Sequence, residues 1–315
     1  MKLKIFAALL LLGLAHAAPT TYNYCIIVKK EQFPENLVKY TGEHDIVKIV
    51  VPVNSLNFDD FDSIVKKAIH FNPKVAGNLT LFFIEADVDE SGKLNYQGLY
   101  VLKNNKAKKI LENGRDAAAS VGDNTSSVFL AASDGLYLYN DEDQSAQKYG
   151  SITDNIIAID KESETDVLYI LTEDKTVYRV TDNGNKKEKL EDVKNAQQLV
   201  IDSQNNLYFY TTDKKLYVRT SEGVKQVTGL PEEHSSLVLA KYLVGLDDFL
   251  PILVDYKFYS VYANGTFSTS PQVEFTTDFQ PTAFTLEGTI VQYYGYNKKI
   301  YEINQLPYTV GKCWY

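Results

Sequence analysis

The sequence predicts an all-β fold, a six-bladed β-propeller with four-stranded blades, on three observations. An apolar residue followed by Tyr opens a short strand six times, and the spacings between these Tyr residues are 37, 41, 39, 42 and 42. A turn containing Asp or Asn precedes most of the pairs, and another apolar strand precedes that turn. Tyr is abundant, with 23 residues in a chain of 315, and it suits half-buried strands. A period near forty with four strands is typical of a propeller blade.

Each unit is expected to contain an inner strand, a second strand, a turn, the Tyr strand and a weaker fourth strand. The repeated pairs contain Tyr100, Tyr137, Tyr178, Tyr217, Tyr259 and Tyr301. The turns carry Asp134, Asp174, Asp213, Asp255 and Asn297, residue types that cap turns with their own side chains. The second strands are expected at 81–84, 128–130, 167–171, 207–210, 252–254 and 290–294. The inner strands are expected at 69–72, 157–160, 199–202 and 284–287. The fourth segments include 189–191 and 224–227.

The two ends of the repeat array predict how the ring closes. The last unit has only about eight residues after its Tyr strand, so an N-terminal strand is expected to complete the last blade. Residues 45–51 are expected to form a strand that precedes the inner strand of the first blade. Residues 55–67 are expected to form a short helix, because their apolar side chains fall on one helical face.

The N-terminus has the pattern of an export signal. Lys2 and Lys4 precede the apolar stretch 5–14, and Ala15-His16-Ala17 has the form of a cleavage site. We therefore expect a signal peptide at 1–17, a single propeller domain at 18–315, and a secreted, extracellular protein. An uncleaved anchor is the alternative. Without the signal the formal charge changes from −9 to −11, which argues against nucleic acid or an anionic membrane as partner. We expect a monomer.

Two cysteines and three glycosylation sequons are relevant if the chain is extracellular, because disulfides and N-linked glycans form there. Cys25 and Cys313 are expected to form a disulfide, which by loop entropy contributes on the order of 4–5 kcal/mol. Free thiols or a link to another chain are the alternatives, and two cysteines are too few for structural zinc. N-glycosylation is expected at one or more of three sequons, which begin at Asn78, Asn124 and Asn264.

The search for catalytic motifs predicts a protein that is not an enzyme and needs no metal or cofactor. None of the four histidines has a partner four residues on of the metalloprotease kind, and no nucleophile elbow or phosphate loop is present. The acidic segment 87–91 lacks the spacing of a calcium loop and is expected to be a hairpin turn.

A ligand of a propeller is expected at a mouth of the central channel, next to the residues that enter the inner strands. The candidate ligand-binding residues are His70, Asp116, Asn155, Gln197, Gln198, Ser236, Phe279 and Gln280. They are mostly uncharged, rich in amides and mixed with an aromatic ring, a set that suits a polar, planar molecule. The alternative is that these residues cap strands and hydrogen-bond water, and that His70 is structural.

Two family resemblances follow from these units. Segments 174–180 and 201–209 resemble the strand pairs of regucalcin-like and Yellow-like six-bladed propellers. The first likeness implies a metal-dependent lactonase, although its complete set of metal ligands is not found here. The second implies an extracellular factor that binds amines or proteins.

A closer likeness rests on three features taken together: an early cysteine, the motif Ile69-His70-Phe71-Asn72-Pro73 and the following segment 78–83. This organisation resembles the insect ommochrome-binding proteins, haemolymph carriers of tryptophan-derived pigments. The resemblance implies a secreted carrier of a small planar aromatic ligand, an ommochrome-type pigment, without turnover.

Overall fold

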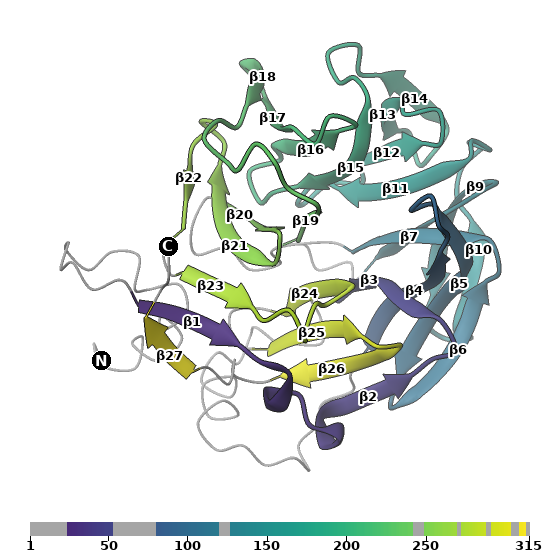
Figure 1. Ribbon diagram of the computed structural model, residues 1–315. Helices are drawn as coiled ribbons and strands as arrows, with labels where there is room; N and C mark the ends of the chain where they lie inside the picture. The colour runs from purple at the N-terminus through teal and green to yellow at the C-terminus, as the bar shows by residue number, and fades with distance from the viewer. Residues whose placement is uncertain are drawn as a thin grey trace, which may run out of the picture.

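The computed structural model describes residues 24–52, 80–119, 127–241, 249–269, 272–287, 291–303 and 309–312. Within these ranges almost every regular element is a strand, and the helical elements are two short 3-10 turns, η3 (Lys30–Gln32) and η4 (Glu35–Leu37). The strands form six sheets that follow one another round a ring in chain order (Figure 1). The chain is therefore a six-bladed β-propeller, as the sequence predicts.

The first four blades are simple antiparallel sheets of four consecutive strands. The first blade contains β3 (Asp45–Val50), β4 (Thr80–Val88), β5 (Leu94–Lys103) and β6 (Lys106–Leu111). The second contains β7 (Gly114–Ala119), β8 (Val128–Ala132), β9 (Gly135–Asn140) and β10 (Ser145–Lys148). The third contains β11 (Ile156–Lys161), β12 (Leu168–Thr172), β13 (Val177–Thr181) and β14 (Lys186–Lys189). The fourth contains β15 (Ala196–Ile201), β16 (Leu207–Thr211), β17 (Leu216–Thr220) and β18 (Gly223–Gln226).

The last two blades incorporate strands from the chain ends. The fifth contains β19 (Leu237–Leu239), β20 (Phe249–Val254), β21 (Lys257–Tyr262), β22 (Phe267–Ser268) and β23 (Gln272–Phe275), and its sheet continues into β1 (Tyr24–Val28) and β27 (Thr309–Lys312). The sixth contains β24 (Ala283–Glu287), β25 (Val291–Tyr296), β26 (Lys299–Ile303) and β2 (Val38–Thr41).

The predicted Asp and Asn turns connect the second and third strands of the blades. Lys175, Lys214 and Asn297 have φ values of 66°, 58° and 49° in these turns, the left-handed region that allows a tight reversal. In the third and fourth blades a Thr hydroxyl at the end of the second strand donates to the Asp carboxylate of the turn. The prediction of these turns is confirmed.

The repeated Tyr has the same environment in several blades. Tyr100 stacks on Phe83 of the neighbouring strand with ring centroids 5.1 Å apart, and Tyr217 stacks on Phe209 at 5.4 Å. In the first three blades a lysine of the fourth strand lies over the Tyr ring: Lys109 over Tyr100, Lys148 over Tyr137 and Lys187 over Tyr178. The ring thus packs inward while a cation covers its outer face, which explains why Tyr recurs at this position.

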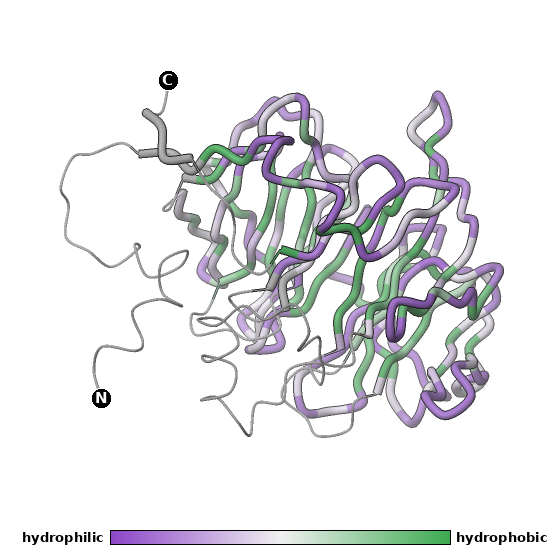
Figure 2. Tube along the Cα trace, turned by 90° about the horizontal axis from the view of Figure 1, so that it is seen from below, coloured by the Kyte–Doolittle hydropathy of each residue, from purple (hydrophilic) through white to green (hydrophobic). Residues whose placement is uncertain are grey.

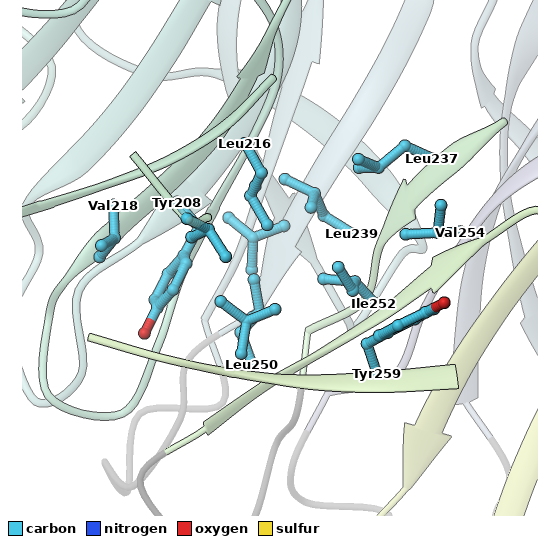
Figure 3. Packing of buried hydrophobic residues seen from close by; sticks show 12 residues of the cluster. Tyr208, Leu216, Val218, Leu237, Leu239, Leu250, Ile252, Val254 and Tyr259 are labelled. Atoms are coloured by element: carbon cyan, nitrogen blue, oxygen red, sulfur yellow. The ribbon is translucent and has the colours of Figure 1, made fainter. Parts of the chain in front are cut away.

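The core lies between adjacent blades. Hydrophobic residues are concentrated in strands, and the connecting loops are mostly hydrophilic (Figure 2), whereas fourth strands such as β14 are polar and exposed. Between the fourth and fifth blades, Tyr208 and Leu216 pack with Leu239, Leu250 and Ile252 (Figure 3). Each blade therefore depends on its neighbours to bury its apolar faces.

An N-terminal strand closes the ring. β2 pairs antiparallel with β26 as the outer strand of the sixth blade, and the chain then passes to β3, the inner strand of the first blade (Figure 1). The prediction of closure by an N-terminal strand is confirmed.

The chain ends meet on the fifth blade instead of the sixth. β1 pairs parallel with β23 and antiparallel with β27, so that Cys25 lies opposite Gly311. Cys313 lies outside the described residues, so its pairing with Cys25 stays a prediction.

Phe33, between η3 and η4, anchors the crossing from β1 to β2. Its ring stacks on Phe279 with centroids 3.7 Å apart and meets Tyr294 and Tyr301 edge-on at 5.4 and 5.8 Å. Its side chain is buried, and Val28 at the end of β1 joins the same cluster. The segment before β2 is therefore held to the fifth and sixth blades by aromatic packing as well as by strand pairing.

One predicted element has a different position. β3 pairs directly with β4, with Ile49 opposite Phe83, so it is the inner strand of the first blade and does not precede that strand. The prediction that residues 69–72 hold this place is wrong, because β3 already fills the inner edge and buries Ile46 and Ile49 against the sixth blade. Residues 69–72, the expected helix at 55–67 and the expected signal at 1–17 lie outside the described residues.

None of the helical segments in the described ranges has the length and apolar character needed to cross a membrane.

Replacing Phe33 by Ala tests its role in ring closure. We expect Phe33→Ala to lower the free energy of unfolding by about 3–5 kcal/mol, because it removes a ring packed between two blades. Urea denaturation measures this loss. Val88→Ala is the control, since Val88 is 56% exposed, and its effect is expected within about 0.5 kcal/mol. Equal stability of the two variants would contradict a closing role for Phe33.

Candidate functional site

The inner strands of the six blades surround a narrow central channel. Its lining is mostly apolar and small, with Ala117, Ala118 and Ala119 on β7, and its polar residues are Lys48, Asp160, Gln198, Lys241 and Thr285. The free volume is about 50 Å³, enough for a few water molecules. Pockets for drug-sized ligands have roughly 300–1,000 Å³, so the channel itself does not hold a multi-ring molecule.

Polar side chains of the inner strands join one blade to the next around this channel. Asp116 of β7 accepts a hydrogen bond from the backbone N–H of Ile159 on β11 at 3.0 Å. Asp160 of β11 accepts one from the N–H of Ile201 on β15 at 2.7 Å. In the same way, Gln198 of β15 accepts from the N–H of Leu239 on β19 at 3.4 Å. These three residues therefore fix the inner strands of four successive blades relative to one another.

Each of the two buried carboxylates also has a lysine partner. Lys48 Nζ lies 3.3 Å from Asp116 Oδ1, and Lys241 Nζ donates to Asp160. Both aspartates are buried, whereas both lysines are partly exposed. The cations offset part of the cost of placing charge in this low-dielectric wall. Backbone N–H groups and lysines thus occupy these carboxylates, which link neighbouring blades.

A second polar group, the mouth cluster, lies where the inner strands of the second and third blades begin. It consists of Tyr96, Arg115, Asn155, Glu173 and Lys175. Arg115 Nη1 lies 3.1 Å from Glu173 Oε2, and the amide N–H of Asn155 donates to the same oxygen. The guanidinium of Arg115 lies over the ring of Tyr96, 5.2 Å from its centroid.

Local backbone features bring these side chains together. The β7–β8 register shifts between Gly114 and Asp116, so Arg115 lies in a β-bulge, a feature that redirects a side chain. The N–H of Glu173 donates to the carbonyl of Asn155 at 2.9 Å, which places the β12–β13 turn beside the start of β11.

The first blade supplies a wall to this cluster. β4 and β5 have 9 and 10 residues, whereas the second and third strands of the other blades have 5 or 6. Tyr96 pairs with Ala86 in this extra length, beyond a register shift at Glu85. The β4–β5 hairpin therefore extends far enough for the Tyr96 ring to lie against the Arg115 guanidinium.

The charges of the cluster are coupled. The hydrogen bond from Arg115 is the main reason that the pKa of Glu173 is lowered, so this carboxylate is ionised at neutral pH. Burial raises the pKa of Tyr96 to about 12, and the negative charge of Asp116 adds to the effect. Burial lowers the pKa of Lys175, an effect that the charge of Glu173 opposes.

The structure brings some of the predicted site residues to the channel or to the mouth cluster. Asp116 and Gln198 form blade-to-blade hydrogen bonds at the channel, and Asn155 belongs to the mouth cluster. Ser236 donates through its N–H to Asp255 at 2.9 Å, and the Gln197 amide donates to the carbonyl of Asn195 at 3.4 Å. The last two residues hold the beginnings of inner strands within their own blades.

The other predicted residues lie elsewhere. Phe279 is fully buried against Phe33 in the core and does not line the channel, and Gln280 is exposed. Asn264 is exposed in the β21–β22 turn, where its side-chain oxygen accepts from the N–H of Thr266 at 2.9 Å. His70, Asn78 and Asn124 lie outside the described residues.

Sequence reasoning missed most of the charged residues near the channel. Lys48 and Asp160 interrupt apolar runs of inner strands. A charged residue in such a run could have indicated a polar position in the channel wall. Arg115 and Lys175 had no such signal, because a bulge and a turn bring them to the mouth. No group of three or more His, Cys, Asp or Glu side chains placed to hold a metal ion occurs in the part of the chain that the structure describes.

A scan against protein-family models finds no match, and a search of curated proteins finds none. Among solved structures, the WD40 repeats of RRP9 are similar with a TM-score of 0.56 and 8% identity, over 88% of this chain and 98% of that chain. U3-55K is similar with a TM-score of 0.51 and 8% identity, over 88% of this chain and 99% of that chain.

A larger protein is also similar in part. PorZ, a surface component of the type-IX secretion system of Porphyromonas gingivalis, matches 75% of this chain at 11% identity with a TM-score of 0.47. This chain spans only 31% of the PorZ chain. At such identities the likeness concerns the fold alone.

Asp116 predicts a pH effect on stability. Burial raises the pKa of Asp116, although Lys48 opposes the shift. Between the ordinary Asp pKa of about 3.9 and the raised folded value, the folded state binds more protons than the unfolded state, so this residue makes stability fall as pH rises. We expect the free energy of unfolding of the wild type, relative to Asp116→Asn, to decrease as pH rises from 3 towards 7.

Urea denaturation of both proteins at a series of pH values measures this difference. The other carboxylates affect the stability of both proteins alike, so their contributions largely cancel in the difference. A difference that increases with pH would show that Lys48 and the backbone N–H groups outweigh the burial of the Asp116 charge.

Proposed function

We propose that this protein is a non-catalytic, extracellular binding protein for a small planar aromatic ligand, which it holds at the channel mouth. The observation that carries the proposal is the mouth cluster, where Arg115 lies over Tyr96 and pairs with Glu173 beside the Asn155 amide. A guanidinium, an aromatic ring and an amide offer planar groups and directed hydrogen bonds, which suit a flat ligand with polar edges.

The size of the channel supports a site at its mouth. With about 50 Å³ of free volume and small, packed lining residues, the channel leaves no room for a fused ring system. The mouth cluster includes Arg115, whose neighbour in sequence, Asp116, pairs with the channel residue Lys48.

The state of the carboxylates supports binding over hydrolysis. Asp116 and Asp160 are held by lysines and backbone N–H groups, and Glu173 is held by Arg115 and Asn155. A carboxylate engaged in this way is a poorer general base or metal ligand, because neighbouring cations and hydrogen-bond donors compensate its charge. The lactonase-type alternative therefore has less support than a carrier.

The resemblance to insect ommochrome-binding proteins supplies the ligand class to test first. We propose an ommochrome-type pigment, carried by a secreted, glycosylated monomer. The exposed sequon at Asn264 is compatible with such a chain.

Pigment titration tests the proposal. We expect xanthommatin to bind the purified protein at micromolar concentration, with a change in the pigment absorbance. Tyr96→Ala is expected to weaken binding about five- to tenfold, because it removes the ring that supports the guanidinium of Arg115. Tyr178→Ala is the matched control, since Lys187 lies 4.5 Å from that ring but on the fourth strand of the third blade.

Absence of any spectral change at micromolar pigment would contradict the pigment proposal. An equal effect of Tyr96→Ala and Tyr178→Ala would contradict the location at the mouth cluster. Hydrolysis of lactones by the purified protein would favour the lactonase alternative, and saturable binding of biogenic amines in place of pigment would favour the Yellow-like one.

A further inference from the structure

The cavity in the central channel is lined by hydrogen-bond donors from four different blades. They are Lys48 of the first blade, Gln198 of the fourth, Lys241 just after β19 of the fifth, and Thr285 of the sixth. The free volume of about 50 Å³ corresponds to roughly three to five water molecules. The four side chains therefore border one small space, which differs from the mouth cluster in both place and size.

Both lysines extend along the channel toward the third blade. Lys241 belongs to the fifth blade, yet its Nζ donates to Asp160 on β11 of the third blade. A side chain that passes the fourth blade in this way runs over the channel-facing side of the inner strands. Lys48 Nζ, from the first blade, lies 3.4 Å from Asp116 Oδ2, the oxygen that also accepts from the N–H of Ile159 in the third blade. Both ammonium groups therefore lie at the channel wall.

The two carboxylates of this wall already have donors. Asp160 accepts from two backbone N–H groups and from Lys241. Asp116 also accepts from two backbone N–H groups, and its Oδ1 atom lies 3.3 Å from Lys48 Nζ. Their negative charges are therefore compensated by neighbouring cations and backbone dipoles, which reduces their repulsion of an anion in the cavity.

The donors, by contrast, have N–H and O–H groups to spare. Gln198 accepts from the N–H of Leu239 through its side-chain oxygen, and its amide N–H groups have no acceptor in the described part of the chain. The hydroxyl of Thr285 also has no partner there. Neither group is fully enclosed by protein atoms. An ammonium has three N–H donors, and Lys48 has one side-chain partner, Asp116. The unfilled hydrogen bonds at the cavity are therefore those of donors.

We propose that the central channel binds a small monovalent inorganic anion of the size of chloride, held by Lys48, Gln198, Lys241 and Thr285. This site goes beyond the proposed carrier function and does not depend on it, because the pigment is proposed to bind at the mouth cluster.

The donor character of the cavity favours an anion over water. An anion accepts hydrogen bonds from several directions, and its charge is attracted by two ammonium groups in a low-dielectric space. A water molecule accepts about two hydrogen bonds, and its own hydrogens then need acceptors in a cavity whose carboxylates already have donors. The small volume excludes larger organic anions.

Chloride NMR line broadening on the purified full chain tests the inference. We expect wild-type protein to broaden the chloride resonance in a saturable way at millimolar chloride. Bromide should compete, whereas gluconate, which is too large for the cavity, should not. Absence of saturable broadening, or equal competition by gluconate, would overturn the proposal.

Two variants examine the donors. Gln198→Glu keeps an oxygen for the N–H of Leu239 but replaces the amide donors by a negative charge, so we expect chloride to bind about tenfold or more weakly. Thr285→Val keeps the side-chain shape and removes the hydroxyl, with an expected loss of about three- to tenfold. Thr285→Val decides the matter if Gln198→Glu does not fold, because it changes no charge.

Lys103→Met is the control. Lys103 is ion-paired with Asp141 at 2.6 Å and its side chain is 21% exposed, comparable to Lys48 at 26%, but it does not line the cavity. Its removal should leave chloride affinity unchanged. Unchanged affinity in Thr285→Val, or an equal loss in Lys103→Met, would contradict a site in the channel. In crystals grown with bromide, an anomalous peak between the four side chains supports the site, and water alone at that place overturns it.

Discussion

The pairing of β2 with β26 is the constraint on which the rest of the structure depends. Each blade buries its apolar faces against the blades on either side, so an open ring would expose the first and last blades to water. β2 closes that gap with backbone hydrogen bonds, and Phe33 adds a ring packed onto Phe279, Tyr294 and Tyr301. The chain segment from β1 to β3 consequently joins the fifth, sixth and first blades (Figure 1).

Closure of the ring has direct consequences for the candidate site. It brings six inner strands around a channel so narrow that Asp116, Asp160 and Gln198 reach from one blade to the backbone of the next. The charged groups of the channel wall therefore serve the scaffold. Other polar side chains lie instead at the mouth cluster, on Arg115, Asn155 and Glu173, where a bulge and a turn release side chains from the strand pattern.

The sequence predicted the blades well and the site only in part. Strand alternation and the Asp turns act over a few residues, so the repeat showed where the Tyr strands and their neighbours lie. Gln198 lines the channel, and Asp116 and Asn155 lie at or next to the starts of inner strands, where the repeat pattern put them. Phe279 also precedes one, yet it turns into the core to meet Phe33 from the other end of the chain. No local pattern contains that contact.

By itself, the sequence determined the number of blades, the order of their strands, the turns between them and the need for a strand from the N-terminus. These features follow from periods and propensities that are read along the chain. Only the tertiary structure decided that β3 is the inner strand of the first blade and that the chain ends meet on the fifth blade. It also decided that Arg115 contacts both Tyr96 and Glu173. The physical reason is that these contacts join residues of different blades, and their geometry exists only once the ring has closed.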